Sequence, residues 1–185
     1  MKKAILLLLI CLFPFTQTFS QYAPKYVTLE HFTNTYCGNC SWKNPPLTNL
    51  VADNTSHVHH IYYHPNVPYP QCSYYQHNTA DNNARKTYYG INGTPRVVMN
   101  GTYNSFFTPL LTQAHLDTAI NHTSPLRIKV EETTGMTRDV TVTVKTFEAI
   151  SNPNLRLFVA VTEKYTDFHS PNGETEHHNV MRDIL

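Results

Sequence analysis

The chain has 185 residues, a formal net charge of +1 and only 15% charged residues. A nearly neutral chain excludes the strongly basic surface of a nucleic-acid-binding protein and the polybasic segment of a membrane-surface binder. The low share of charged residues suits an extracytoplasmic protein better than a cytosolic enzyme. The length suits one domain of ordinary size and a smaller unit, because single domains have about 100–200 residues.

Residues 1–20 have the pattern of a secretory signal peptide. Lys2 and Lys3 precede an apolar stretch at 4–15, and a polar tail at 16–20 ends on a small residue. The apolar stretch is shorter than the ~20 residues that a membrane-spanning helix needs. We therefore expect cleavage before Gln21 and export to the periplasm, the outer membrane or the exterior. The mature chain would keep three cysteines, because Cys11 belongs to the leader.

Residues 21–123 show strands alternating with helices. β-Branched and aromatic residues predict strands at 26–33, 57–63 and 96–99, and apolar spacing predicts helices after Cys40, at 79–88 and from Thr108. The pair Asn100-Gly101 is typical of a hairpin turn. From residue 124, strand-like runs at 126–133, 139–147 and 154–163 follow each other with no helix between them. This change predicts an α/β unit at 21–123 and a separate β unit at 124–185.

A Cys-x-x-Cys motif, Cys37-Gly38-Asn39-Cys40, follows the first predicted strand and opens a predicted helix. Unpaired backbone N–H groups and the helix dipole at this position favour a thiolate over a thiol. Motifs of this kind lower a thiol pKa from ~8.5 into the range ~3.5–7.5. We therefore expect an exposed Cys37 sulfur to act as the nucleophile. Cys40, one helical turn further and more buried, would then resolve the mixed disulfide.

Two other interpretations of the motif stay open. A zinc site could draw further ligands from Cys72 and the histidines, but a second Cys-x-x-Cys or a histidine pair at zinc-finger spacing is absent from the sequence. A static disulfide is the other interpretation, because exported proteins keep their cysteines oxidised. We predict neither a metal nor another cofactor.

A second motif, Gly93-Thr94-Pro95, precedes the β-branched strand at 96–99 and suits a cis peptide bond. Together the two motifs resemble the thioredoxin family over residues 25–120. The resemblance implies a thioredoxin-like fold. It also implies that Thr94 and Pro95 bind the substrate segment as an extra strand and keep metal ions away from the cysteines.

Residues close to the first motif depart from the thioredoxin pattern. Tyr36 stands where these proteins usually have tryptophan, and we assign it to substrate binding. The buried acid that helps to deprotonate the second cysteine falls at His31, with Glu30 beside it on the opposite face of the strand. The resemblance implies that His31, which titrates near neutral pH, or Glu30 accepts the proton. If neither residue accepts the proton, the attack of Cys40 on the mixed disulfide is slow.

A narrower resemblance rests on the stretch at 30–33, the YGIxGTP stretch at 89–95 and GETEHHNVMRDIL at 173–185. These stretches resemble the twenty-eight-kilodalton outer membrane protein family of Bacteroidetes-type bacteria. Members are exported and have a thioredoxin-like domain followed by a β-sandwich. Further strands follow the last stretch in that family, so we expect 124–185 to be an incomplete sandwich-like segment and the chain to be a fragment.

Four histidines and one cysteine need separate interpretation. Side chains alternate along a strand, so the pair at 57 and 59 faces away from the pair at 60 and 64, and we expect no metal site there. Cys72 lies in a predicted loop at 70–73. We expect it to be a spare or buried thiol.

The sequence therefore predicts an α/β, thioredoxin-like fold followed by a partial all-β segment. The expected function is that of an exported thiol:disulfide oxidoreductase. Its partners would be thiols and disulfides of exported proteins and a separate redox protein. The alternative is a non-catalytic surface or outer-membrane-associated binding protein with a static Cys37–Cys40 disulfide. The dipeptide Gly38-Asn39 does not distinguish reduction, oxidation and isomerisation.

Overall fold

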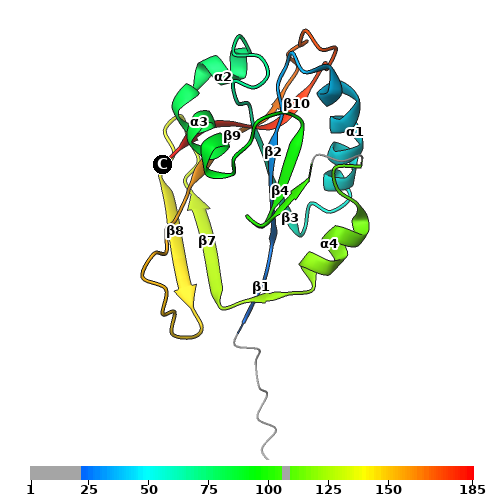
Figure 1. Ribbon diagram of the computed structural model, residues 1–185. Helices are drawn as coiled ribbons and strands as arrows, with labels where there is room; N and C mark the ends of the chain where they lie inside the picture. The colour runs from blue at the N-terminus through cyan, green and yellow to red at the C-terminus, as the bar shows by residue number, and fades with distance from the viewer. Residues whose placement is uncertain (1–21, 106–108) are drawn as a thin grey trace, which may run out of the picture.

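The computed structural model describes residues 22–105 and 109–185 (Figure 1). The predicted signal peptide and the expected helix start at Thr108 lie outside these residues. The strands are β1 (Ala23–Pro24), β2 (Val27–Phe32), β3 (Val58–Tyr63), β4 (Arg96–Met99), β5 (Tyr103–Ser105), β6 (Thr123–Ser124), β7 (Leu126–Glu132), β8 (Val140–Thr146), β9 (Ala160–Thr166) and β10 (His177–Ile184). The helices are α1 (Gly38–Ala52), α2 (Ser73–His77), α3 (Thr79–Tyr88) and α4 (Gln113–Ile120). Within the described ranges, no helix is long and apolar enough to cross a membrane.

A six-stranded sheet with the order β5-β4-β2-β3-β10-β9 forms the centre of the molecule (Figure 1). β2 and β3 are parallel, with Val27 opposite Val58, and α1 makes the crossover between them. β10 is also parallel to β3. The other three pairs of neighbouring strands are antiparallel: β2 with β4, β4 with β5, and β10 with β9. The chain runs from the carboxyl end of β2, through residues 33–36, into the cysteine motif.

Helices cover both faces of the central sheet. Successive side chains of β2 point to opposite faces, so this strand contributes apolar side chains to both layers. On one face, Leu29 packs with Leu47 of α1 and Leu116 of α4, and none of the three is more than 2% exposed. On the other face, Phe32 packs with Ile91, which follows α3. Each fully buried side chain of this size contributes about 1.5–3 kcal/mol to folding. These two apolar layers therefore fix where α1, and with it the cysteine motif, lies on the sheet.

The buried face of α1 consists of Cys40, Asn44, Leu47 and Val51. Their spacing of three or four residues places them along one side of the helix. Trp42 falls outside this stripe and is 53% exposed. The second cysteine is therefore the first member of the stripe that anchors the helix to the sheet.

Most elements predicted in the first part of the chain are confirmed. β2, β3 and β4 match the expected strands within two residues, and α3 spans the expected 79–88. The turn between β4 and β5 has positive φ at Asn100 (51°) and Gly101 (73°), the conformation that this pair favours. Two details differ. The short helix α2 was missed, and α4 begins at Gln113 after a capping box at Thr112.

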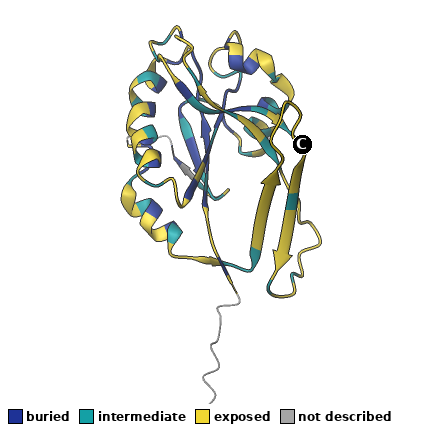
Figure 2. Cartoon of the chain, turned by 180° about the vertical axis from the view of Figure 1, so that it is seen from behind, coloured by how far each residue is buried: buried dark blue, intermediate teal, exposed yellow. Residues whose placement is uncertain are grey.

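Strands β9 and β10 lie in the central sheet, whereas we expected them in a separate sandwich-like segment. β10 pairs with β3, with Val180 opposite Tyr62, and β9 pairs with β10. β7 and β8 form a two-stranded sheet that is almost entirely exposed (Figure 2). The residue pattern of a strand shows which side chains point to each face of a sheet, but it does not determine which distant strand pairs with it. The α/β fold with an added β segment is thus confirmed, and the division near residue 123 stays a prediction.

Candidate functional site

Cys37 and Cys40 form a disulfide at the N-terminal end of α1, with Cα atoms 5.3 Å apart. Cys37 is the N-cap residue, and its sulfur accepts a hydrogen bond of 3.2 Å from the Cys40 backbone N–H. The positive end of the helix dipole favours a thiolate at this place once the disulfide is reduced. Cys40 is fully buried, as expected, but Cys37 is only 4% exposed. The expectation of an exposed Cys37 is wrong because the backbone of Thr94 and the side chain of Asn172 lie against it.

The Thr94–Pro95 peptide bond is cis, as the second motif predicted. The carbonyl oxygen of Thr94 lies 3.4 Å from the Cys37 sulfur, and Pro95 is buried. The Thr94 hydroxyl donates to the carbonyl oxygen of Val67 at 3.4 Å, which connects this loop to the loop that follows β3. The structure therefore brings the two sequence motifs together at one end of the central sheet.

Tyr36 lies at the surface directly before the motif and is 36% exposed. Its ring centroid is 6.1 Å from that of Tyr69. The buried Asn34 donates from its side-chain amide to the carbonyl oxygens of Pro65 at 3.0 Å and Tyr69 at 2.9 Å. Its side-chain oxygen accepts from the Tyr36 N–H at 3.0 Å. Asn34 thereby holds the two tyrosines together on one rim of the site.

His31 lies on the α1 face of β2 and is fully buried. Its ring stacks on His60 at a centroid distance of 5.5 Å and lies 4.6 Å from the ring of Tyr62. Burial lowers the pKa of His31 well below its ordinary value, and the neighbouring His60 adds to this effect. The expectation that His31 titrates near neutral pH is therefore wrong, because a protonated ring here would lose its hydration without gaining a counter-ion.

Glu30 lies on the opposite face of β2, away from α1. Its carboxylate accepts two hydrogen bonds from the guanidinium of Arg85 on α3, at 2.6 and 2.8 Å. It also accepts one from the hydroxyl of Tyr89 at 2.5 Å. This carboxylate therefore forms an ion pair with Arg85 of α3. It does not lie on the α1 face of the sheet, where Cys40 is buried.

The segment between β9 and β10 reaches the cysteine motif, and the sequence did not predict this contact. The side-chain amide of Asn172 donates to the carbonyl oxygen of Cys37 at 3.0 Å and to the carboxylate of Glu174 at 2.6 Å. The other oxygen of Glu174 accepts from the amide of Asn44 on α1 at 2.7 Å. Burial raises the pKa of Glu174, although the two amide hydrogen bonds oppose this shift. The resemblance at 173–185 marked this stretch but assigned it to a second domain.

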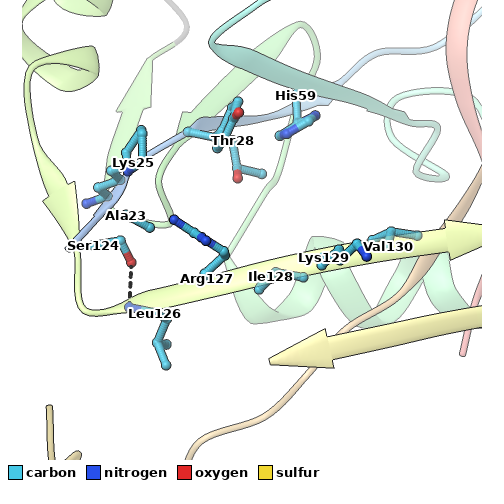
Figure 3. A pocket seen from close by; sticks show the side chains of 12 residues that line it. Ala23, Lys25, Thr28, His59, Ser124, Leu126, Arg127, Ile128, Lys129 and Val130 are labelled. Atoms are coloured by element: carbon cyan, nitrogen blue, oxygen red, sulfur yellow. Dashed lines mark hydrogen bonds between the residues drawn. The ribbon is translucent and has the colours of Figure 1, made fainter. Parts of the chain in front are cut away.

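Two grooves differ in their relation to the cysteine motif. One of about 220 Å³ lies between α1 and the segment at 173–178, and Asn44, Tyr62 and Glu174 line it. A larger groove of about 880 Å³ lies where β1 and β2 approach β7, and Lys25 and Arg127 are among its lining residues (Figure 3). Neither groove includes a residue of either motif. The smaller groove is lined by Ser41, the residue after Cys40, and is therefore the one next to the candidate site.

The histidine cluster is divided between the surface and the interior. His57 and His59 are exposed, whereas His60 and His64 are buried. Across residues 22–105 and 109–185, no group of three or more histidine, cysteine or acidic side chains is placed to hold a metal ion. The alternation that the strand pattern predicted explains why one neighbouring pair of histidines, His59 and His60, faces opposite sides of the sheet.

Cys72 is a free thiol with no exposed surface, and its sulfur accepts a hydrogen bond of 3.2 Å from the Thr35 hydroxyl. In a variant with Cys37→Ser and Cys40→Ser, we expect a maleimide to label Cys72 about 10²-fold more slowly in the native protein than in urea. Mass spectrometry of the labelled peptide measures both rates. Equal rates in the two conditions would contradict the burial of this thiol.

No family model matches this chain, and no curated protein matches it at a significant level. Two solved structures do. HBP35 of Porphyromonas gingivalis aligns with a TM-score of 0.68 and 18% identity over 88% of this chain and 57% of that protein. Protein AGR_C_4864 from Agrobacterium tumefaciens aligns with a TM-score of 0.63 and 16% identity over 88% of this chain and 72% of that protein. The chain thus spans little more than half the length of HBP35. Low identity with high structural similarity means that this chain shares its fold with these two proteins.

Proposed function

We propose that the protein is a thioredoxin-like thiol:disulfide oxidoreductase. The observation that carries the proposal is the Cys37–Cys40 disulfide at the N-terminal end of α1, with the carbonyl of Thr94 and the cis Pro95 beside it. The strand order β5-β4-β2-β3, with α1 between two parallel strands, supports the thioredoxin-like interpretation. Thr94 and Pro95 would hold the substrate backbone, and Tyr36 would contact its side chains.

The proposed cycle exchanges one disulfide for another. In the reducing direction, the Cys37 thiolate attacks a substrate disulfide, forms a mixed disulfide and releases one substrate thiolate, which takes a proton. The Cys40 thiolate then attacks the Cys37 sulfur, and the second substrate sulfur leaves as a thiolate and is protonated. Two electrons pass from the protein to the substrate, and the Cys37–Cys40 disulfide forms again. The oxidising direction is the reverse of these steps.

We place this activity outside the cytoplasm, acting on thiols and disulfides of exported proteins. The support is the leader-like pattern at residues 1–20. Stable disulfides are typical of exported proteins, and a redox pair in that compartment needs a separate redox partner to regenerate it. The same support extends to a location at the outer membrane or cell surface.

Replacing Cys40 by serine tests the proposed cycle. Because Cys37 keeps its nucleophilic sulfur and the resolving thiol is lost, Cys40→Ser should accumulate mixed disulfides with substrate proteins and reduce dithiol turnover to the uncatalysed rate. Non-reducing electrophoresis followed by mass spectrometry identifies the adducts, and a reductant should release them.

Cys37→Ser is the matched control, because it removes the attacking sulfur and should trap nothing. Cys72→Ser should behave like the wild type. If Cys40→Ser forms no adduct and the wild type shows no dithiol activity, the Cys37–Cys40 disulfide is structural. The protein would then be a non-catalytic binding protein.

A further inference from the structure

Two side-chain amides from distant parts of the chain hold Glu174 against the first two turns of α1. Asn44 donates to one carboxylate oxygen at 2.7 Å, and Asn172 donates to the other at 2.6 Å. Asn172 also donates to the carbonyl oxygen of Cys37 at 3.0 Å, and Asn44 donates to the hydroxyl of Thr33 at 2.8 Å. A single carboxylate therefore connects the start of α1 to its second turn and to the end of β2.

The carboxylate of Glu174 also lies on the same side of α1 as the resolving cysteine. Cys40 and Asn44 are both buried and are four residues apart on this helix, a spacing that places side chains on one face in consecutive turns. A negative charge in a partly buried place makes a second negative charge nearby more costly than it would be in water. The charge of Glu174 and a thiolate at the pair should therefore oppose each other.

We propose that Glu174 is a positioning residue of the Cys37–Cys40 pair and that its charge is coupled, through Asn44 and Asn172, to the redox state of the two sulfurs. The inference rests on the proposed thiol–disulfide exchange at this same pair. When two glutathione thiols reduce the protein, the Cys37–Cys40 bond breaks, glutathione disulfide leaves and two protons remain. One proton stays on Cys40. The other stays on Cys37 or, where Cys37 is a thiolate, is held by Glu174 instead of passing to solvent.

The surroundings of Glu174 allow it to hold and exchange a proton. Burial raises its pKa, so it takes up a proton closer to neutral pH than an exposed glutamate does. It also lines the groove of about 220 Å³ between α1 and the segment at 173–178. This groove gives the carboxylate a route by which a proton can pass to and from solvent.

Several other titratable side chains lie on the elements around Glu174. They are Tyr62 on β3, His31 on β2, and Glu176, His177 and His178 in the same segment. Burial raises the pKa of Tyr62 and lowers the pKa of His31 and of His177, so these three groups stay neutral near pH 7. Glu176 pairs with His178 at 3.8 Å, at the exposed side of the groove. Glu174 is therefore the carboxylate whose charge we expect to act on the cysteine pair.

The equilibrium constant for reduction by glutathione, measured from about pH 4.5 to about pH 8.5, tests the coupling. Glu174→Gln keeps a side chain of the same shape and removes the charge. At about pH 7 its equilibrium constant should be about threefold or more above that of the wild type, because a reduced pair with a Cys37 thiolate no longer faces a carboxylate. The two curves should converge as the pH falls towards about 4.5, because protonation of Glu174 removes the same charge from the wild type.

Glu176→Gln is the matched control. It removes the same charge two residues further along, from a side chain that is 58% exposed, and should follow the wild type at every pH. An offset for Glu174→Gln that is constant with pH would show a structural role only and would overturn the coupling. So would identical curves for Glu174→Gln and Glu176→Gln. A wild-type disulfide that does not exchange with glutathione at all would overturn the proposed function first, and this inference with it.

Discussion

Lowering the pH from about 7 to about 5 should reduce the free energy of unfolding, by about 2 kcal/mol through His60 alone, because three buried histidines resist protonation. They are His31, His60 and His64, none of which is more than 7% exposed. Burial lowers the pKa of all three, that of His60 to about 3. Below the unfolded value near 6.5, the unfolded chain binds protons that the folded protein cannot, so stability falls with the pH.

A loss of about 2 kcal/mol from one histidine is already a large part of the stability of a domain, which is about 5–15 kcal/mol, and His31 and His64 add to this loss. His177, whose pKa burial also lowers, adds to the loss. Glu174, whose pKa burial raises, opposes it, because the folded protein then binds a proton before the unfolded chain does. Acid sensitivity should therefore be the dominant feature of the stability of this protein.

Urea unfolding at the two pH values measures the loss. His60→Gln removes one of the three buried groups and should reduce the pH-dependent loss by about 2 kcal/mol. His59→Gln, at the neighbouring exposed position of β3, should keep the full loss. Each variant is compared with itself at two pH values, so a change in its absolute stability does not affect the comparison. Equal pH dependence of the two variants would refute the assignment to buried histidines.

Replacing Glu30 by alanine should lower the free energy of unfolding by about 3–5 kcal/mol. The side chains of Glu30 and Arg85 are only 8% and 15% exposed, so the substitution leaves a guanidinium charge in the interior without its counter-ion. Tyr89 loses an acceptor for its hydroxyl in the same change. Urea unfolding at neutral pH measures the effect.

Two further variants separate the ion pair from simple packing. Arg85→Met combined with Glu30→Met removes both charges and should recover much of the loss, because no buried charge is then left unpaired. Glu131→Ala removes an exposed carboxylate that pairs with Lys129 at 2.6 Å, with both side chains more than half exposed. It should cost less than about 1 kcal/mol. A cost for Glu30→Ala as small as this would contradict a buried ion pair.

The local features of the candidate site could be predicted from the sequence. The cysteine pair lies where a strand ends and a helix begins, and both elements have their own patterns of apolar residues. The cis bond at Pro95 was predictable because proline, a preceding Gly-Thr and a following β-branched strand stand next to each other in the chain. These features depend on residues that are neighbours in the chain, so they can be predicted without knowledge of the fold.

The neighbours of Glu30 and His31, and the pKa of His31, could not be predicted in the same way. Alternation along β2 places them on opposite faces, as the sequence indicated. What each face contains depends on elements that come later in the chain: Arg85 of α3 neutralises Glu30, and His60 of β3 stacks on His31. A pKa depends on burial and on nearby charge, and both are set by these distant neighbours.

The sequence by itself thus determined the α/β character, the helix that begins at the cysteine motif, and the residues that form it. Only the tertiary structure decided that β10 joins the central sheet beside β3, and that Asn172 and Glu174 thereby reach Cys37 and Asn44. The physical reason is that periodicity and turn residues specify local conformation. The pairing of strands far apart in the chain is chosen by the packing of the whole core.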